Sequence, residues 1–213
     1  MKKLNDTFVI SKRGWLLIAL VGVLFLFFSV TALHLFQYLF GAMLIALLII
    51  FRNPERGANR AEVGAIVSPA DGIVLTIEDR NIDGIEVKKI VILNTLWDVS
   101  ILRSPCDCSV DGVKFRTGAS LSLFNPLSEQ LNEKCVISFK TPHDSDIYVE
   151  HIGEKNCFKL AVDLEKSQEL SLSERYGFLS KGRTSIYLPQ NSRVAIEVGT
   201  SLKAGESIVG YFA

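Results

Sequence analysis

Glu-Arg-Tyr-Gly-Phe-Leu-Ser-Lys-Gly-Arg-Thr-Ser-Ile-Tyr-Leu-Pro, residues 174–189, is the most informative segment of this chain. Ser185 to Leu188 includes the β-branched and aromatic side chains typical of a strand, and Pro189 marks its end. Gly177 and Gly182 precede this strand in the chain. The stretch therefore predicts a β-strand that ends at a proline.

Short apolar runs with β-branched residues, separated by Gly, Asn and Asp, continue through the chain after Pro54. This pattern predicts strands, and no segment of the region has the periodicity of an amphipathic helix. The other predicted strands span residues 65–67, 73–78, 84–93, 98–102, 109–115, 136–140, 147–152, 158–162 and 193–198. Turn signals at 81–84, 142–145 and 153–156 separate several of them. We therefore expect a mostly β domain of antiparallel sheets.

The two ends of this region look like two halves of one small module. Val-Ser-Pro-Ala-Asp-Gly-Ile-Val at residues 67–74 is similar to the opening of a lipoyl-type barrel sandwich, and Val-Gly-Thr-Ser-Leu-Lys-Ala-Gly-Glu at 198–206 is similar to its close. The chain has no Met-Lys-Met or Asp-Lys-Ala tip to carry a cofactor. A non-enzymatic sandwich module tethered to the membrane is therefore one hypothesis for this protein.

Four motifs, in chain order, resemble one family. Phe-Arg-Asn-Pro-Glu-Arg at 51–56, Ser-Pro-Ala-Asp-Gly at 68–72, Asp-Val-Ser-Ile-Leu-Arg-Ser-Pro at 98–105 and the stretch 174–189 resemble motifs of the short, membrane-anchored phosphatidylserine decarboxylases. In that family the fourth motif reads roughly Arg-Phe-Gly, a few variable residues, Gly-Ser and a strand that ends in Tyr-Leu-Pro. The resemblance covers essentially the whole chain.

The resemblance also implies a reaction. In the family, a serine hydroxyl attacks the carbonyl of the preceding residue, and elimination from the resulting ester leaves a new chain that begins with a pyruvoyl group. An aspartate and a histidine assist that serine. The pyruvoyl cofactor forms a Schiff base with phosphatidylserine and accepts electrons as carbon dioxide leaves, which yields phosphatidylethanolamine. The implied process is phospholipid biosynthesis.

The family's catalytic positions are only partly present in this chain. Asp71 stands at the family's aspartate, and Ser100, which has no nitrogen base, replaces the histidine. Alignment on Gly182 puts Arg183 at the serine position, whereas alignment on the Tyr-Leu-Pro end puts Gly182 there. Neither side chain offers a leaving group for the elimination, so no pyruvoyl group is expected to form. We expect Asp71 at a turn near Ser100 and Gly182; an ordinary Asp-Gly turn is the alternative for Asp71.

Hydroxyl side chains near the missing serine are the candidates for a displaced nucleophile. Ser185 is the weak candidate that we single out, and Thr184 and Ser180 lie in the same stretch, but none of them follows a glycine. Ordinary strand and turn roles account for all three. His143 is predicted to lie exposed in a polar turn, and His151 is predicted to be a strand side chain and not a general base.

An uncharged, apolar run of 38 residues, from Gly14 to Phe51, precedes the β region. One membrane-spanning helix needs about 20 residues, so the run predicts two helices with a turn near residues 31–34. Basic residues flank both ends of the run, which favours two cytoplasmic ends. We expect a cytoplasmic tail at 1–13, a transmembrane hairpin at 14–51 in the inner membrane, and a cytoplasmic β domain at 52–213. A single long tilted helix and a re-entrant hairpin are the alternatives.

Charge and cysteine content argue against other classes. Residues 52–213 have a formal charge of about −3, whereas nucleic-acid-binding surfaces are basic, so no nucleic-acid partner is expected. Cys106 and Cys108 form a Cys-x-Cys pair, but no second pair or nearby histidine completes a zinc site. With Cys135 and Cys157, they are predicted to be reduced, buried residues without a metal.

Three hypotheses for function follow. The first is a membrane protein of the decarboxylase type that binds a phospholipid such as phosphatidylserine without forming the pyruvoyl group, as a lipid-binding or regulatory protein, a homo-oligomer or the partner of an active relative. The second is an active decarboxylase with a displaced nucleophile. The third is the sandwich module. The apolar residues 121–127 are expected either to dip toward the bilayer and help admit a lipid or to fold over the core.

Overall fold

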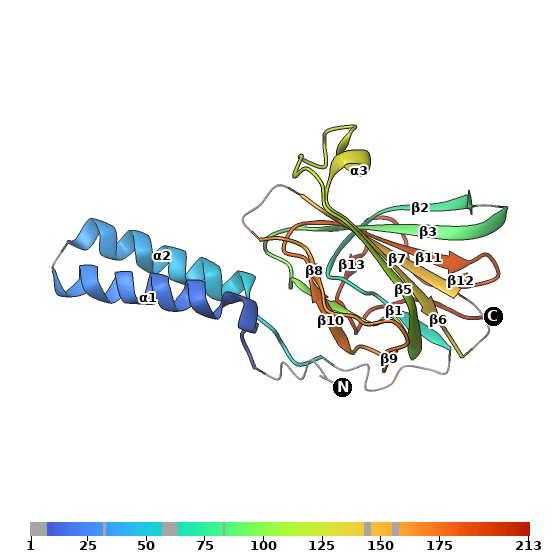
Figure 1. Ribbon diagram of the computed structural model, residues 1–213, viewed down its shortest axis with the longest axis horizontal. Coiled ribbons are helices and arrows are strands. Elements are labelled where there is room, and N and C mark those ends of the chain that lie inside the picture. The colour runs from blue at the N-terminus through green and yellow to red at the C-terminus, as the bar shows by residue number, and fades with distance from the viewer. Residues whose placement is uncertain (1–7, 32, 57–63, 83, 143–145, 155–157) are drawn as a thin grey trace. The chain divides into compact units, whose positions relative to one another are not determined.

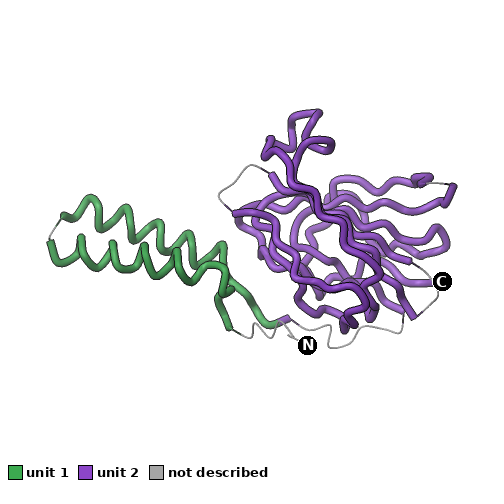
Figure 2. Tube along the Cα trace, in the orientation of Figure 1, with its two compact units in different colours: residues 1–55 green, residues 56–213 purple. Residues whose placement is uncertain are grey.

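The computed structural model describes residues 8–31, 33–56, 64–82, 84–142, 146–154 and 158–213. The chain divides into two compact units, a helical unit of residues 1–55 and a β unit of residues 56–213 (Figure 2). His143 and Cys157, together with part of each predicted turn at 81–84, 142–145 and 153–156, lie outside the described residues.

The helical unit is a hairpin of two apolar helices (Figure 1). Phe28 of the first helix stacks on Phe36 and Phe40 of the second, with ring centroids 5.1 and 5.2 Å apart. The first helix ends at Val30 and the second begins at His34, so the predicted turn near residues 31–34 is confirmed. The elements are η1, a 3-10 helix (Lys12–Gly14), α1 (Trp15–Val30) and α2 (His34–Ile50).

The two helices differ as candidate membrane spans. Lys12–Val30 is a helical segment of 19 residues with a mean hydropathy of 2.2, long and apolar enough to cross a membrane. α2 is also apolar, but its 17 residues are fewer than the roughly 20 that a membrane-spanning helix needs. Among the described residues there is therefore one candidate span, where the sequence predicted a pair. This apolar helix indicates association with a membrane.

The β unit consists of short strands and one helical turn. Its described elements are β1 (Ala65–Val67), β2 (Gly72–Ile82), β3 (Ile85–Asn94), β4 (Ile101–Arg103), β5 (Cys108–Arg116), α3 (Ser128–Leu131), β6 (Lys134–Lys140), β7 (Asp146–Gly153), β8 (Ala161–Val162), β9 (Glu169–Leu170), β10 (Arg175–Phe178), β11 (Gly182–Pro189), β12 (Arg193–Val194), β13 (Ser201–Leu202) and β14 (Ile208–Tyr211).

Eight of these strands form a curled sheet in the order β13-β2-β3-β11-β7-β6-β5-β9 (Figure 1). Two three-stranded sheets, β1-β14-β12 and β4-β10-β8, complete the unit. Neighbouring strands in all three sheets are antiparallel. The prediction of a mostly β fold built from antiparallel sheets is therefore confirmed.

The two ends of the β unit meet through strand pairing. In the β13–β2 pair, Ser201 lies opposite Ile73 and Leu202 opposite Gly72. β14, near the end of the chain, pairs with β1. These pairings bring the turn between β1 and β2 next to the loop that follows β13.

β11, the strand of the stretch 174–189, lies in the middle of the large sheet between β3 and β7. Ile186 and Leu188 on this strand are fully buried and belong to the main core cluster. Burial of a side chain of this size contributes about 1.5–3 kcal/mol. The second half of the stretch singled out in the sequence therefore lies at the centre of the large sheet, whereas its first half forms β10 in the sheet β4-β10-β8.

The sequence missed four strands, β9, β10, β13 and β14. Each has two or four residues, which is too short for the alternation of buried and exposed side chains to show. Three predicted strands are displaced or shorter: 98–102 corresponds to β4, 158–162 to β8, and 193–198 to β12. α3 is a helix of four residues that the sequence did not predict.

Candidate functional site

Asp71 lies in the turn between β1 and β2, directly before Gly72. Gly72 has a φ angle of +147°, and a Cβ atom there would lie 2.1 Å from the carbonyl oxygen of Leu93. Only glycine avoids this clash with the backbone of β3. The Asp-Gly pair therefore starts β2 in close contact with β3, and it leaves Asp71 buried with 5% of its surface exposed.

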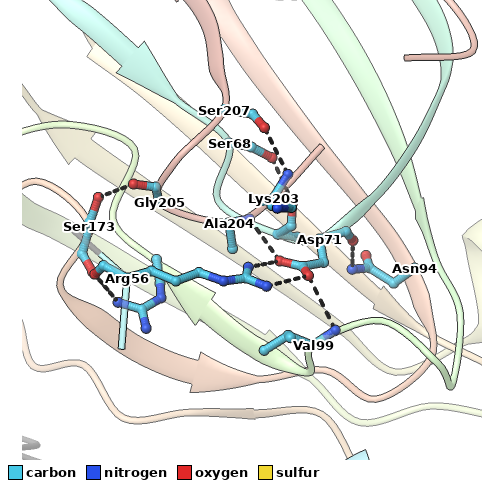
Figure 3. A network of polar contacts seen from close by, with 12 residues as sticks. Arg56, Ser68, Asp71, Asn94, Val99, Ser173, Lys203, Ala204, Gly205 and Ser207 are labelled. Carbon is cyan, nitrogen blue, oxygen red and sulfur yellow. Dashed lines mark hydrogen bonds and ion pairs between the residues drawn. The ribbon is translucent and has the colours of Figure 1, made fainter. Parts of the chain in front are cut away.

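Four hydrogen bonds engage both carboxylate oxygens of Asp71 (Figure 3). The guanidinium of Arg56 donates through both terminal nitrogens, from Nη1 to Oδ1 and, at 3.1 Å, from Nη2 to Oδ2. The backbone N–H of Ala204 donates to Oδ1 at 2.7 Å, and that of Val99 donates to Oδ2 at 3.3 Å. Bidentate arginine–carboxylate pairs are among the stronger polar contacts in proteins. The carboxylate thus links three segments that are distant in the sequence, whereas an ordinary turn would use nearby amides.

Arg103 extends this network to the chain around Arg56. Its Nη1 donates to the carbonyl oxygens of Arg56 at 3.2 Å and of Ser173 at 3.0 Å. The hydroxyl of Ser173 donates to the carbonyl of Gly205 at 2.6 Å, and the N–H of Gly205 donates to the carbonyl of Ser68 at 2.9 Å (Figure 3). Arg56, Asp71 and Arg103 come from three of the four sequence motifs, so the fold gathers those motifs in one place.

Asp71 and Gly182 are connected through Asn94, and Ser100 contacts the turn before Gly182. The side-chain amide of Asn94 donates to the backbone carbonyl of Asp71, and Asn94 stands opposite Gly182 in the β3–β11 pair. The N–H of Leu179, in the turn between β10 and β11, donates to the carbonyl of Ser100 at 2.7 Å. Ser100 itself is buried. The contacts are made mainly by backbone groups, and the catalytic roles of these positions stay predictions.

Gly182 and Arg183 open β11 at the position where a Gly-Ser pair was sought. The backbone of both residues is paired with β3 on one side and β7 on the other. A Cβ atom on Gly182 would lie 2.2 Å from the carbonyl oxygen of Ile152, so no side chain fits there unless the backbone shifts. The guanidinium of Arg183 forms an ion pair with Glu129 of α3 at 2.5 Å. The segment is thus a regular strand from its first residue.

The three candidate hydroxyls around this position are all buried. Ser185 lies in the interior of β11, opposite Val91 of β3 and Glu150 of β7. Ser180 lies in the turn before β11, and its Oγ has no hydrogen-bond partner among the described residues. Attack on the preceding carbonyl would bend the backbone at Ser185 out of two strand pairings, which disfavours that residue as a nucleophile.

A chain of buried hydrogen bonds connects the core to Asp71. The hydroxyl of Tyr176 lies 2.8 Å from Nε2 of His151, and Nδ1 of His151 lies 3.0 Å from Oγ1 of Thr184. Oγ1 of Thr184 donates to Oδ1 of Asn94 at 3.1 Å, and Nδ2 of Asn94 donates to the carbonyl of Asp71. His151, Thr184 and Tyr176 are completely buried.

Asn94 fixes the direction of every bond in this chain. Its amide nitrogen faces a carbonyl, which only accepts, so its amide oxygen faces Thr184. The hydroxyl of Thr184 must donate to that oxygen and therefore accepts a hydrogen from Nδ1 of His151. The unprotonated Nε2 then accepts from Tyr176. Burial lowers the pKa of His151 to about 3, so the ring stays neutral at physiological pH. His151 is a hydrogen-bonded strand residue, as predicted.

The three described cysteines, Cys106, Cys108 and Cys135, are buried and free. A hydrogen bond with Cys106 lowers the pKa of Cys108, and the same contact raises that of Cys106; burial raises the pKa of Cys135 to about 12. Within the described ranges, no group of three or more His, Cys, Asp or Glu side chains is placed to hold a metal ion.

The family is decided by comparison with known proteins. A family model for phosphatidylserine decarboxylase matches residues 45–210 of this chain. The chain belongs to the phosphatidylserine decarboxylase family. The phosphatidylserine decarboxylase proenzymes of Burkholderia vietnamiensis, Burkholderia ambifaria and Burkholderia cenocepacia are each 26% identical to it over 204 residues, which cover 94% of this chain and 95% of each relative.

Sequence reasoning located Asp71 of this phosphatidylserine decarboxylase-family chain but missed its partners. Arg56 was interpreted only as a flanking charge of the apolar run, although it closes the motif at 51–56. Asn94 lay just beyond a predicted strand and carried no signal. Tyr176 belongs to the fourth motif and His151 to a predicted strand, but their contact depends on the β7–β11 pairing and the position of β10, which local patterns do not reveal.

Proposed function

We propose that this member of the phosphatidylserine decarboxylase family binds phospholipid at a membrane without forming a pyruvoyl group. The observation that carries the proposal is the start of β11. Either Arg183 or Gly182 stands at the family's serine position, both are paired on two sides, and neither can undergo the elimination that produces the cofactor. The proposed role is that of a lipid-binding or regulatory protein.

The surrounding residues do not fit self-cleavage either. A general base needs a free lone pair within hydrogen-bond reach of the nucleophile. Both carboxylate oxygens of Asp71 accept hydrogen bonds from Arg56 and backbone amides. Ser100 supplies a hydroxyl where an imidazole would be needed. In this proposal Asp71 has a structural role and not a catalytic one. Its ion pair with Arg56 joins the first residues of the β unit to the rest of that unit.

An active decarboxylase with a displaced nucleophile is the second candidate, and the contact between Thr184 and His151 is the observation that favours it. A hydroxyl 3.0 Å from an imidazole resembles an activated nucleophile. The bond runs the wrong way, however, because Nδ1 of His151 donates to Thr184. The peptide of Thr184 is also held between β3 and β7. We therefore prefer a structural role for this contact.

The membrane attachment proposed here is a hairpin in which both α1 and α2 cross an inner membrane, with the β unit on the cytoplasmic side. The length and hydropathy of Lys12–Val30 support the first crossing. At 17 residues, α2 is at the lower limit of about 17–25 residues for a crossing. Reporter fusions at the two ends of the chain test this: two cytoplasmic ends are expected, and an external N-terminus would leave a single crossing.

The proposed ligand is a phospholipid of the phosphatidylserine type, bound by the chain alone, as a homo-oligomer or beside an active relative. The purified full-length chain is incubated in mixed micelles with phosphatidylserine that is labelled in its carboxyl group. We expect no labelled carbon dioxide and, by native mass spectrometry, retention of phosphatidylserine over phosphatidylcholine. Release of labelled carbon dioxide that Thr184→Val or Ser185→Ala abolishes would favour the second candidate. Equal retention of phosphatidylserine and phosphatidylcholine, without release of labelled carbon dioxide, would favour a sandwich module that binds neither lipid specifically.

A further inference from the structure

The segment between β5 and β6, residues 117–133, projects beyond the edge of the large sheet and includes α3 (Figure 1). We call it the apolar loop. From Thr117 to Ser128 it contains no charged side chain. At its tip Phe124 is 95% exposed, and Leu127 is 50% exposed. The tip is thus not folded over the core, which was one of the two expectations for residues 121–127.

The base of the apolar loop is firmly held. Asn132 is completely buried, and its side chain binds the N–H and carbonyl of Leu121 and the carbonyl of Gly153 at 2.8–2.9 Å. The hydroxyl of Ser122 donates to Oε1 of Glu154 at 3.2 Å. The exposure of the tip is therefore a property of a structured loop, because polar contacts fix both of its sides.

Two basic residues beside the missing serine also hold this loop. Lys181 pairs with Glu154 at 3.2 Å, and Glu154 in turn accepts from Ser122. Arg183 pairs with Glu129 of α3 at 2.5 Å. Ion pairs thus link the start of β11 directly to the apolar loop. Anything that binds the loop would therefore lie close to the position where the family's chains are cleaved.

Four backbone N–H groups of the tip find their acceptors within the tip. The N–H of Asn125 donates to the carbonyl of Ser122, and the N–H of Ser128 donates to that of Asn125, both at 2.9 Å. The side chain of Asn125 accepts from the N–H of Leu127 at 2.9 Å, and that of Ser122 from Phe124 at 3.4 Å. Pairing of these N–H groups within the tip lowers the cost of moving it out of water, because each unsatisfied backbone group costs free energy in hydrocarbon.

We propose that the tip of the apolar loop inserts into the lipid bilayer. Three observations select a bilayer as the occupant: the same chain carries an apolar helix suited to a membrane, the tip is uncharged, and four of its backbone N–H groups are paired within it. Large apolar side chains at a tip of this kind enter the boundary between headgroups and acyl chains. The proposal rests on the membrane attachment proposed above and is independent of the loss of catalysis.

The test places one fluorophore at a time on the full-length chain in phosphatidylethanolamine–phosphatidylglycerol liposomes. Cys157→Ser is the background, since the other three cysteines are buried. A nitrobenzoxadiazole label is attached to Phe124→Cys, to Val198→Cys as an exposed apolar control on the β unit, and to Leu20→Cys on α1. Lipids with nitroxides on their acyl chains quench labels inside the bilayer, and iodide quenches labels in water.

For Phe124→Cys we expect strong quenching by the acyl-chain nitroxides and at least a fivefold lower iodide quenching constant than for Val198→Cys. Iodide quenching equal to that of Val198→Cys would overturn the proposal. Protection from iodide without quenching by nitroxides would also overturn it, because a protein would then cover the loop. Quenching of Leu20→Cys by nitroxides shows separately that the helical anchor is in the bilayer, so a failure of the loop and a failure of the anchor give different results.

Discussion

His151 should make the stability of the β unit depend on pH below neutrality. Its ring is completely buried between Tyr176 and Thr184, and burial lowers its pKa from 6.5 to about 3. The unfolded chain takes up a proton on this side chain near pH 6.5, whereas the folded protein does not until about pH 3. Because the unfolded state binds more protons in this window, the free energy of unfolding falls as the pH falls.

The size of the effect follows from the depressed pKa of His151. Each pH unit below 6.5 removes about 1.4 kcal/mol, so lowering the pH from 7.5 to 4.5 should cost about 3 kcal/mol through this group alone. His151→Phe removes the titrating group and both of its hydrogen bonds. At pH 7.5 the variant should be about 2–4 kcal/mol less stable than the original chain, because it leaves Tyr176 and Thr184 with unsatisfied buried hydroxyls. At pH 4.5 that deficit should shrink by about 3 kcal/mol.

The free energies of unfolding of the original chain and of His151→Phe are measured at pH 7.5 and pH 4.5. Urea unfolds the full-length protein in detergent, and far-ultraviolet circular dichroism monitors the transition. Carboxylates that titrate in both proteins cancel in the difference. Tyr176→Phe is the matched control, since it removes one hydrogen bond to His151 but keeps the imidazole, and its deficit should stay constant between the two pH values. A His151→Phe deficit that is the same at pH 7.5 and pH 4.5 would refute the assignment of a neutral, buried imidazole.

Three further predictions concern the network, the start of β11 and the buried thiols. Arg56→Ala should lower the free energy of unfolding by about 3 kcal/mol, because it leaves the carboxylate of Asp71 buried with only backbone donors. A double-mutant cycle with Asp71→Ala should give a coupling energy above about 1 kcal/mol, and additive effects of the two substitutions would contradict the pairing. Gly182→Ala should lower the free energy of unfolding in urea by more than about 2 kcal/mol. Gly112→Ala, where a Cβ meets nothing within 4 Å, should change it by less than about 0.5 kcal/mol. Equal effects of the two substitutions would contradict the close approach of the Ile152 backbone to Gly182. Cys135, whose pKa is raised to about 12, should resist iodoacetamide in the folded protein at pH 8 and react after denaturation, as peptide mass spectrometry would reveal; rapid labelling without denaturant would mean that the thiol is accessible.

The sequence predicted the class of the fold because strands of five or more residues show their composition and their periodic burial. β2, β3, β5, β6, β7 and β11 were located in this way. β9 and β13 have two residues each and are strands only because β5 and β2 lie beside them. Such edges depend on tertiary pairing, which a local pattern does not contain.

The candidate site was predicted where one residue belongs to a motif, and it was missed where a contact joins distant segments. Asp71 was identified from the Ser-Pro-Ala-Asp-Gly motif, and its approach to Ser100 and Gly182 was expected from the family resemblance. Its ion pair with Arg56 was missed, because a basic residue after an apolar run is also what membrane orientation requires. Asn94, which connects Asp71 to the hydrogen bonds of the core, becomes meaningful only once β3 is paired with β11.

The mass of the purified full-length chain under denaturing conditions tests the central claim most directly. Because β11 begins without a serine at the Gly-Ser position, we predict a single unprocessed species at the full-length mass of 23.6 kDa. Self-cleavage would instead give two chains, and the C-terminal one would begin between residues 180 and 185 with an α-keto acyl group, which has no free amine for Edman degradation. Detection of that blocked C-terminal chain would contradict the claim that this protein has lost pyruvoyl chemistry.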